Sequence, residues 1–182
     1  MEHLVERLAA ARIGGTFNQY AGSELRRERL RAYLETRGEA EVVLVGEAAG
    51  YRGARVSGLA FTSERQLTGQ GPAEASATIV HRVLAELGLE DSVLLWNVVP
   101  THPGTASSNR RPTRAEVAAG RPFLAEVVRG RRAIAVGRVA ESVLECPYVR
   151  HPSHGGATEF AQGLRSAFAT IPPRRANGAL FL

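Results

Sequence analysis

Residues 41–46 read EVVLVG, a short apolar run that ends in glycine. A run of this length and composition is typical of a strand buried on both faces of a parallel sheet. The run at 92–99, SVLLWNVV, has the same character and is stopped by Pro100. Shorter apolar segments follow at 133–136 and 147–150. The sequence therefore predicts four short strands.

Segments with the helical spacing of apolar residues alternate with these strands. We expect helices at residues 3–11, at 23–36, from Pro72 to about 87, from 112 to about 129, at 137–144 and at 157–169, with Pro172 and Pro173 closing the last one. Thr113 and Glu116 fit a capping box at the start of the fourth helix. The stretches 47–71 and 101–111 are expected to be irregular. The alternation predicts an α/β fold with three α/β/α layers and a short, mainly parallel four-stranded sheet, in one domain over residues 1–182.

Composition narrows the class of protein. The chain has 182 residues, a length that suits one globular core. Its only cysteine, Cys146, excludes a disulfide framework, a four-cysteine zinc site and a four-cysteine iron–sulfur cluster. The absence of lysine excludes a Walker A loop and a pyridoxal Schiff base. No run approaches ~18 apolar residues and the N-terminus lacks a signal-peptide pattern, so we expect a soluble, cytoplasmic protein without a membrane partner.

Charge is distributed unevenly along the chain. The net charge is +5; residues 1–100 carry 11 arginines and 13 acidic residues, whereas residues 101–182 carry 12 arginines and 5 acidic residues. A basic half favours a polyanionic partner, and arginine suits bidentate contacts with phosphate. The competing interpretation is a GC-rich genome, which favours arginine codons.

Polar residues gather where the predicted strands end: after the first, at the end of the second and after the fourth. In parallel α/β folds, ligands bind beyond the carboxyl ends of the strands. After the first strand, GEAAGYRG at 46–53 supplies glycines that let backbone N–H groups approach a ligand. The spacing of these glycines differs from the dinucleotide fingerprint, which also runs directly into a helix, and so argues against a nicotinamide or flavin site.

Several of these positions have both a structural and a functional interpretation. Phe61 is either a core residue or an aromatic platform for a flat ligand. Asn97 ends the second strand, where its amide either ties down a loop backbone or reads a ligand edge with a donor and an acceptor. His151, Ser153 and His154 precede a helix N-terminus. They bind an anion there, share a metal ion, or are two surface histidines beside a capping serine.

Three motifs follow one another at these strand ends. The first reads GEAAG at 46–50 and GLAFTS at 58–63; the second is LLWNVV at 94–99, followed by NRRPT at 109–113; the third is RHPSHGG at 150–156. In this order the motifs resemble those of the uracil-DNA glycosylase superfamily, and the resemblance covers nearly the whole chain. The first motif is most similar to the G-E-A-P-G branch of that superfamily.

The resemblance implies a DNA repair enzyme that flips a deoxyuridine out of single- or double-stranded DNA and hydrolyses its N-glycosidic bond, with other deaminated bases as further candidate substrates. It implies that Phe61 stacks on the base, that Asn97 matches its Watson–Crick edge, and that a neutral His151 donates a hydrogen bond to the departing base anion. The implied site consists of catalytic His151 and Glu47, base-binding Gly46, Ala48, Phe61 and Asn97, and phosphate-binding Ser153, His154, Gly155, Arg110 and Arg111. No metal or cofactor is implied, and a monomer is expected. Because a lyase step needs an amine nucleophile and lysine is absent, the enzyme is expected to be monofunctional.

The chain departs from the family pattern at several positions. The best-known branch has a water-positioning aspartate where this chain has Ala48, and the usual proline is Ala49. The iron–sulfur cysteines of the G-E-A-P-G branch are absent, and residues 154–156 stand where a bulky apolar wedge is often found. Ala48 motivates one alternative, a domain of the same fold that binds damaged or abasic DNA without catalysis. Another is an α/β enzyme that handles nucleotides or sugar phosphates at the same strand ends.

Overall fold

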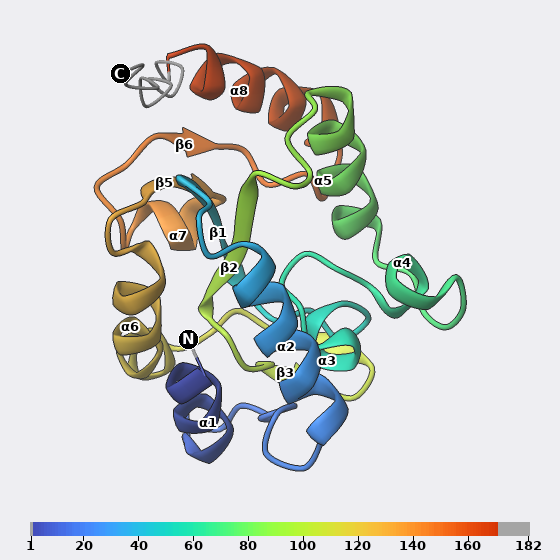
Figure 1. Cartoon of the computed structure of the whole chain (residues 1–182), viewed down its shortest axis with the longest axis vertical. Coiled ribbons are helices and arrows are strands. Elements are labelled where there is room, and N and C mark those ends of the chain that lie inside the picture. Colours follow the sequence, from blue (N-terminus) through green and yellow to red (C-terminus); the bar gives the residue numbers. More distant parts are fainter. Residues whose placement is uncertain (1, 171–182) are drawn as a thin grey trace, which may run out of the picture.

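The computed structural model describes residues 2–170 of the chain. Four strands form the central sheet in the order β2-β1-β5-β6, and every neighbouring pair is parallel. They are β1 (Val42–Ala48), β2 (Val93–Val99), β5 (Arg132–Val136) and β6 (Tyr148–Val149). Figure 1 shows this sheet at the centre of the molecule, with helices around it. The predicted three-layer α/β/α fold with a four-stranded parallel sheet is confirmed.

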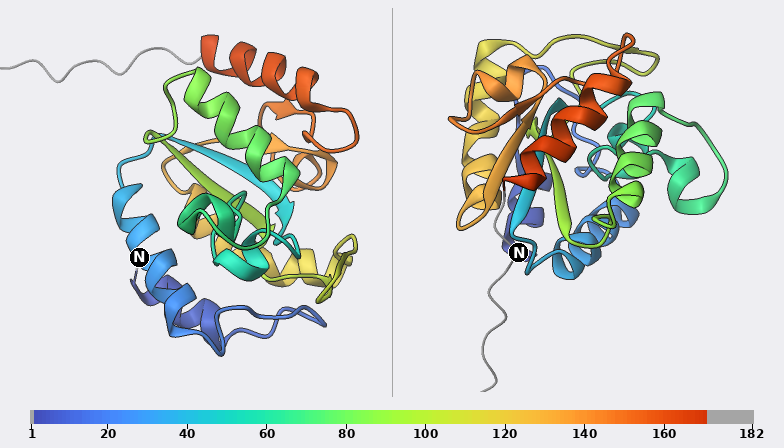
Figure 2. Two further views of the ribbon diagram at one scale, coloured as in Figure 1. Left: turned by 90° about the vertical axis from the view of Figure 1, so that its right-hand side faces the viewer. Right: turned by 90° about the horizontal axis from the view of Figure 1, so that it is seen from above.

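The alternation of side chains along the strands divides the core into two clusters. Val43 and Val45 of β1 pack into one cluster, whereas Val42 and Leu44 pack into the other, because successive strand residues point to opposite faces. Helices α1 (Glu2–Ala10), α2 (Glu24–Thr36), α6 (Arg114–Val128) and α7 (Arg138–Glu141) cover the first cluster, and α5 (Ala75–Glu86) and α8 (Ala157–Ala169) cover the second. In the right-hand view of Figure 2, α6 and α5 lie on opposite sides of the strands.

The strand order opens a crevice at the carboxyl ends of β1 and β5. The chain passes from β1 to its neighbour β2 at one side, and from β5 to its neighbour β6 at the other. Connections that diverge from two adjacent parallel strands leave room between them for a ligand. Gly46 at the end of β1 lies in register beside Asn97 of β2. The sheet therefore brings polar positions of the first two motifs together at this edge.

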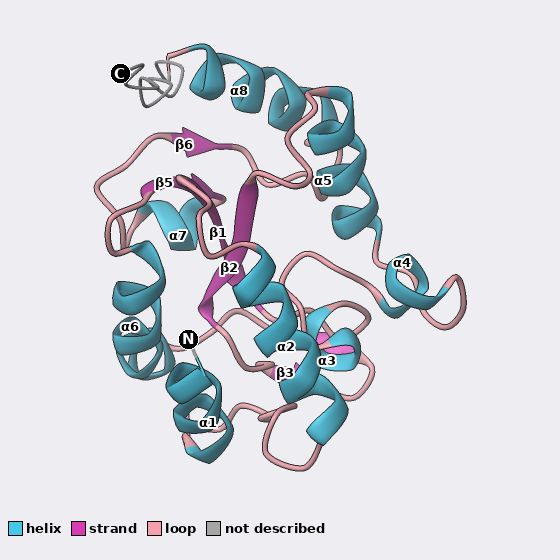
Figure 3. Cartoon of the chain, viewed as in Figure 1, coloured by secondary structure: helices cyan, strands magenta, loops and turns pink. Residues whose placement is uncertain are grey.

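Both segments that were expected to be irregular contain short elements, which Figure 3 marks by colour. Helices α3 (Ala54–Ser57) and α4 (Glu64–Thr68) lie in the first segment, and strands β3 (Gly104–Thr105) and β4 (Ser108–Asn109) pair as an antiparallel hairpin in the second. The expectation of irregular structure is wrong here because elements this short do not display a hydrophobic period.

Helix α5 begins later than the proline rule predicts. Its first residue is Ala75, and Glu74 is the N-cap. The carbonyl of Pro72 accepts a hydrogen bond from the N–H of Arg65 at 3.3 Å, so Pro72 belongs to the turn that closes on α4. A helix start predicted from Pro72 alone misses this long-range contact.

The capping box predicted for α6 is confirmed. The Thr113 hydroxyl oxygen accepts a hydrogen bond from the N–H of Glu116 at 3.2 Å, and the Glu116 carboxylate accepts one from the N–H of Thr113 at 2.8 Å. Helix α7 is shorter than the predicted span of 137–144. The expected stop at 172–173 lies outside the described residues. The prediction of one domain over 1–182 also extends beyond them and stays a prediction. Within residues 2–170, no helix is long and apolar enough to cross a bilayer.

Candidate active site

A cavity of about 380 Å³ lies at the carboxyl ends of the strands. Segments that follow β1, β2, β5 and β6 form its walls. Eight predicted site residues line it: Glu47, Ala48, Phe61, Asn97, Arg110, His151, Ser153 and His154. Gly46 is buried against two of these side chains, and Arg111 and Gly155 lie outside the wall. The structure thus brings residues of all three motifs around one cavity.

Gly46 lets Phe61 and Asn97 approach each other at the end of β1. A Cβ atom at residue 46 would collide with the Phe61 ring and would lie 2.7 Å from Asn97 Oδ1. Any side chain at this position would displace both residues. Gly46 therefore supplies space for the site, a role that only glycine can fill because it has no Cβ.

The side-chain amide of Asn97 is buried and has no partner. Asn97 is 5% exposed, and none of the hydrogen bonds among residues 2–170 involves its amide. Its amide atoms are absent from the fully enclosed polar atoms that lack a partner, so they are open to the cavity. The interpretation in which Asn97 ties down a loop backbone has no such bond to support it. Asn97 instead lines the cavity with its donor and acceptor both available.

Phe61 belongs to the core and also borders the cavity. Its side chain is 7% exposed and packs in the cluster beneath α5 and α8. The ring centroid lies 6.5 Å from that of His151. The backbone of Phe61 has a φ of 51°, in the left-handed region that bulky residues rarely occupy. Such a conformation persists only where the surroundings hold it.

Hydrogen bonds within the segment of residues 49–63, hereafter the β1 loop, hold Phe61 in place. The Ser57 hydroxyl donates to the carbonyl of Thr62 at 2.6 Å and accepts from the N–H of Leu59 at 3.0 Å. The Thr62 hydroxyl in turn bonds the carbonyl of Ala60 at 3.1 Å. These bonds close the turn on both sides of residue 61.

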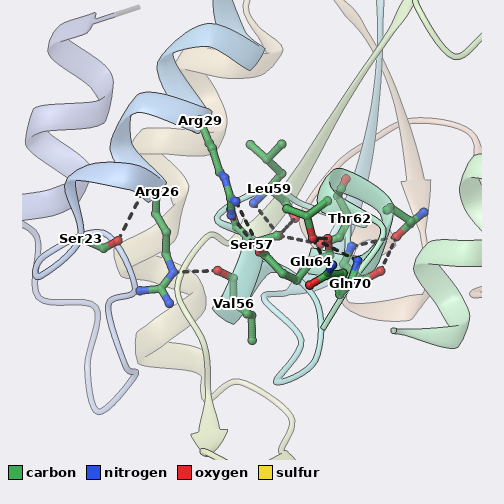
Figure 4. Close-up of polar contacts among 12 residues, drawn as sticks. Ser23, Arg26, Arg29, Val56, Ser57, Leu59, Thr62, Glu64 and Gln70 are labelled. Carbon is green, nitrogen blue, oxygen red and sulfur yellow. Dashed lines mark hydrogen bonds and ion pairs between the residues drawn. The ribbon is translucent and has the colours of Figure 1, made fainter. Parts of the chain in front are cut away.

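Helix α2 anchors the same loop, and the start of α4 directly after it, from outside. Arg26 Nε donates to the carbonyl of Val56 at 2.8 Å, and the Arg29 guanidinium forms two bonds, of 2.8 and 2.9 Å, with the Glu64 carboxylate. Figure 4 shows these contacts reaching from α2 to the turn around Ser57. The position of Phe61 therefore depends on tertiary contacts with a distant helix.

His151 has one occupied and one free ring nitrogen. Its Nδ1 lies 3.2 Å from the backbone nitrogen of Ser153 and 2.8 Å from the Ser153 hydroxyl. Because a backbone N–H only donates, Nδ1 is an acceptor and the proton of the neutral ring sits on Nε2. Burial, followed by the charge of His154, lowers the pKa of His151, which keeps the ring neutral at neutral pH. Among the described residues Nε2 has no hydrogen-bond partner.

Ser153 does not cap helix α8. The N-cap of that helix is Gly156, and no side chain caps it. The Ser153 hydroxyl instead lies between the two imidazoles, 2.8 Å from His151 Nδ1 and 3.0 Å from His154 Nδ1. The capping interpretation is wrong because the chain first turns through left-handed conformations at His154 and Gly155, with φ of 52° and 77°.

The sequence was compared with models of known protein families, and one family matches. The family model of the uracil DNA glycosylase superfamily matches residues 34–179. The chain belongs to the uracil DNA glycosylase superfamily. Membership supports a glycosylase-type hydrolase whose partner is DNA. The resemblance drawn from the three sequence motifs is confirmed.

A comparison with solved structures finds a protein with a similar fold. The crystal structure of wild-type SMUG2 from Pedobacter heparinus superposes with a TM-score of 0.67 at 14% sequence identity, over 91% of this chain and 95% of that one. At this identity the likeness shows the fold alone. No curated protein matches the chain.

In this member of the glycosylase superfamily, Arg111 influences the cavity carboxylate Glu47 through its charge. Burial raises the pKa of Glu47, and the positive charge of Arg111 lowers it in part. Arg111 is exposed and forms no ion pair with any described residue. Arg110, in contrast, donates two hydrogen bonds, of 2.6 and 2.8 Å, to the buried Glu116 carboxylate. These bonds lower the pKa of Glu116 to about 2. Arg110 is therefore engaged within the protein, whereas Arg111 is free to meet a ligand.

Sequence reasoning missed the residues that join the β1 loop to the β3–β4 hairpin. His102 is fully buried; its Nδ1 lies 2.7 Å from the carbonyl oxygen of Ala49 and its Nε2 lies 2.8 Å from that of Thr105. The N–H of Tyr51 donates to Asn109 Oδ1 at 2.9 Å. The sequence offers one signal for these residues, a polar residue just after β2. It does not reveal their partners, because these are backbone atoms and most of them are distant in the chain.

Proposed function

We propose that this protein is a monofunctional DNA glycosylase that removes uracil from DNA by hydrolysing the N-glycosidic bond. One observation carries the proposal. An aromatic ring, an amide without a partner and a neutral imidazole with a free N–H border the same cavity. These groups suit a flat base with a hydrogen-bonding edge that leaves as an anion. The cavity volume of about 380 Å³ lies within the usual range for small-ligand sites.

Base recognition in this proposal begins with flipping, because the target bond is unreachable inside a stacked duplex. Phe61 stacks on the uracil ring. The Asn97 amide accepts from N3–H and donates to O4 of uracil. Cytosine presents the opposite pattern and would leave buried groups unpaired, which disfavours its binding.

Cleavage of the glycosidic bond leaves positive charge on the sugar and negative charge on the departing base. The Nε2–H of His151 stabilises that anion by a hydrogen bond, an interaction that becomes strong only in the transition state. The chain has no lysine to form a Schiff base with the sugar. Water is therefore the nucleophile, and the products are free uracil and an abasic site.

The DNA backbone is proposed to run past the His151 side of the cavity and the start of α6. Ser153, His154 and Gly155 contact one phosphate, and Arg111 contacts another with a guanidinium that no described carboxylate occupies. Arg110 shares its donors with Glu116 and is the weaker phosphate contact of the two. We further propose that the enzyme works in the cytoplasm and without a cofactor. A monomer is proposed because segments of one chain line the whole cavity.

Base release from oligonucleotides tests the proposal. Single- and double-stranded oligonucleotides with one uracil are incubated with the protein, and abasic sites are cleaved with alkali. Strand cleavage that requires uracil, with free uracil detected by chromatography, is expected. No release of uracil, hypoxanthine or xanthine at enzyme in excess over DNA would overturn the assignment.

The alternative function is a DNA- or abasic-site-binding domain without catalysis, and Ala48 is the observation that favours it. At this position the cavity wall carries a methyl group, so residue 48 cannot position water. That function predicts tight binding that weakens steeply with salt. Binding without base release would support it, and detection of free base would reject it.

A further inference from the structure

A second carboxylate, Glu74, lines the same cavity and has no partner. It reaches the wall from the start of α5, on the face of the sheet opposite α6. Among residues 2–170 its carboxylate forms no hydrogen bond and no ion pair. Such a half-buried charge is costly unless it is paired, so an unpaired one calls for an explanation.

The contacts of Glu74 show that the β1 loop is shaped around it. A Cβ atom at Gly50 or at Gly53 would collide with a Glu74 carboxylate oxygen, and would lie 2.9 or 2.8 Å from its Cδ. Two glycines of the loop therefore leave room for this side chain. As the N-cap residue of α5, Glu74 stands where a side chain can accept a hydrogen bond from the helix N-terminus, yet its side chain makes no such bond. It turns towards the β1 loop instead.

No cation near Glu74 neutralises it. The guanidinium groups that line the cavity are those of Arg110 and Arg138, and each is bound to a carboxylate of its own, Glu116 and Glu141. The other titratable groups on the wall are Glu47, His151 and His154. Burial alone raises the pKa of Glu74, whereas the charge of Arg111 opposes the same effect on Glu47. Burial therefore favours proton uptake at Glu74, and no charge of a neighbouring group opposes it.

We propose that Glu74 is the general base that activates the attacking water, an inference that rests on the proposed glycosylase function. The carboxylate accepts a proton as the water oxygen bonds to C1′ of the sugar. The bond between C1′ and N1 breaks, and its electron pair leaves with uracil. The uracil anion takes up a proton from solvent, and Glu74 returns its proton to solvent. Glu74 thereby supplies, from helix α5, the carboxylate that residue 48 does not carry.

Single-turnover release of uracil from a single-stranded oligonucleotide tests this role. Glu74→Gln is compared with the wild type, with Glu47→Gln, and with Glu145→Gln, which alters an exposed carboxyl outside the cavity wall. We expect Glu74→Gln to react at least ~10²-fold more slowly, the usual contribution of a general base, and Glu145→Gln to keep the wild-type rate. Affinity for an oligonucleotide with 2′-fluorodeoxyuridine should be unchanged. Melting should not fall, since the amide removes an unpaired charge.

The pH profile separates a base from a structural residue. At acidic pH the wild-type rate requires Glu74 to be unprotonated and His151 Nδ1 to be free to accept the Ser153 N–H bond that orients the ring, so below both pKa values the logarithm of the rate should rise with a slope near two. In Glu74→Gln this slope should be near one, and in Glu47→Gln it should stay near two. A Glu74→Gln rate within about threefold of the wild type, or a slow variant whose slope stays near two, overturns the role of Glu74.

A second variant covers the case in which Glu74→Gln folds poorly. In Glu74→Ala the lost carboxylate leaves space beside Gly50 and Gly53, so added formate should restore part of the rate. No increase at any formate concentration overturns the proposal. A wild-type protein that releases no uracil overturns the glycosylase function, and this inference with it. If the wild type releases uracil and Glu74→Gln releases it at an undiminished rate, only the role of Glu74 is overturned.

Discussion

The two sides of the cavity are built in different ways. The β1 loop is held by groups from elsewhere in the chain, such as Arg26 of α2 and His102 after β2. Residues 151–156, hereafter the His151 loop, are held mainly by their own side chains, because the Ser153 hydroxyl bonds both His151 and His154. One side of the site therefore depends on long-range packing, and the other depends on local contacts.

This difference indicates where each kind of damage should appear. Removal of a long-range hydrogen bond to the β1 loop weakens its attachment to the rest of the fold, so the free energy of unfolding should fall. Removal of a local bond in the His151 loop leaves the core untouched, so turnover should fall while stability stays. The predictions below test this division, from the largest expected effect to the smallest.

His151→Ala should lower uracil turnover by ~10²-fold or more, because it removes a hydrogen bond to charge that exists only in the transition state. Its melting temperature and DNA affinity should barely change. Single-turnover rates and thermal melts check this, with His3→Ala, an exposed residue of α1, as the control. A variant that melts much lower but keeps its specific activity would make His151 a structural residue.

The pH dependence of the same step follows from the lowered pKa of His151. A neutral ring donates through Nε2, and burial keeps the ring neutral to a pH below its usual 6.5. Protonation of Nδ1 would break its bond with the Ser153 N–H and so release the ring from its position. In Glu74→Gln, which lacks the other titrating group, the rate should therefore hold through pH 6.5 and fall only at lower pH. A rate of this variant that already falls between pH 7.5 and 6.5 would contradict the assignment of a half-buried, neutral donor.

Asn97 sharpens the comparison because it lies in β2, outside both loops, and its amide forms no structural hydrogen bond. Asn97→Asp should weaken uracil excision by about tenfold or more and admit cytosine, since an unsatisfied buried group costs roughly 1–3 kcal/mol. Stability should not fall. The matched control is Asn18→Ala, whose amide donates to the carbonyls of residues 8, 9 and 11 and which should lose stability and keep turnover. Unchanged uracil turnover in Asn97→Ala would make Asn97 a structural amide.

Ser57→Ala should show the opposite behaviour to His151→Ala. It removes the bonds that close the turn around Phe61, and leaves the buried carbonyl of Thr62 without its 2.6 Å partner, at a cost of roughly 1–3 kcal/mol. Denaturant unfolding should report that loss, with Ser107→Ala at the exposed tip of the hairpin as the control. Equal stability of the two variants would break the proposed division between the sides.

Arg111→Ala should have the smallest effect. Loss of one phosphate contact weakens DNA binding about equally for all sequences and reduces the slope of log affinity against log salt by about one. Fluorescence anisotropy at several salt concentrations measures this slope. Arg129→Ala, another exposed arginine, should leave it unchanged. Identical slopes for the two variants would remove Arg111 from the DNA path.

Sequence patterns were sufficient to predict the strands of the sheet, because the patterns that indicate them involve residues close together in the chain. The apolar runs that became β1 and β2, and the capping box of Thr113 and Glu116, each depend on residues a few positions apart. The same holds for the motifs at the strand ends, since parallel strands bring their carboxyl ends together whatever the loops do. Those patterns predicted that Phe61, Asn97 and His151 would share one site, and all three line one cavity.

Tertiary structure alone decided which of these groups are free. Arg110 and Arg111 are neighbours of the same type, yet only Arg110 meets a buried carboxylate. Glu74 is one acidic residue among many, and its place in the cavity depends on two glycines more than twenty positions earlier in the chain. The sequence by itself determined the order of strands, helices and motifs, because local periodicity and capping set them. Pairing of charges and amides was decided only when distant segments packed together, because hydrogen bonds and ion pairs act over a few ångströms in space and take no account of separation along the chain.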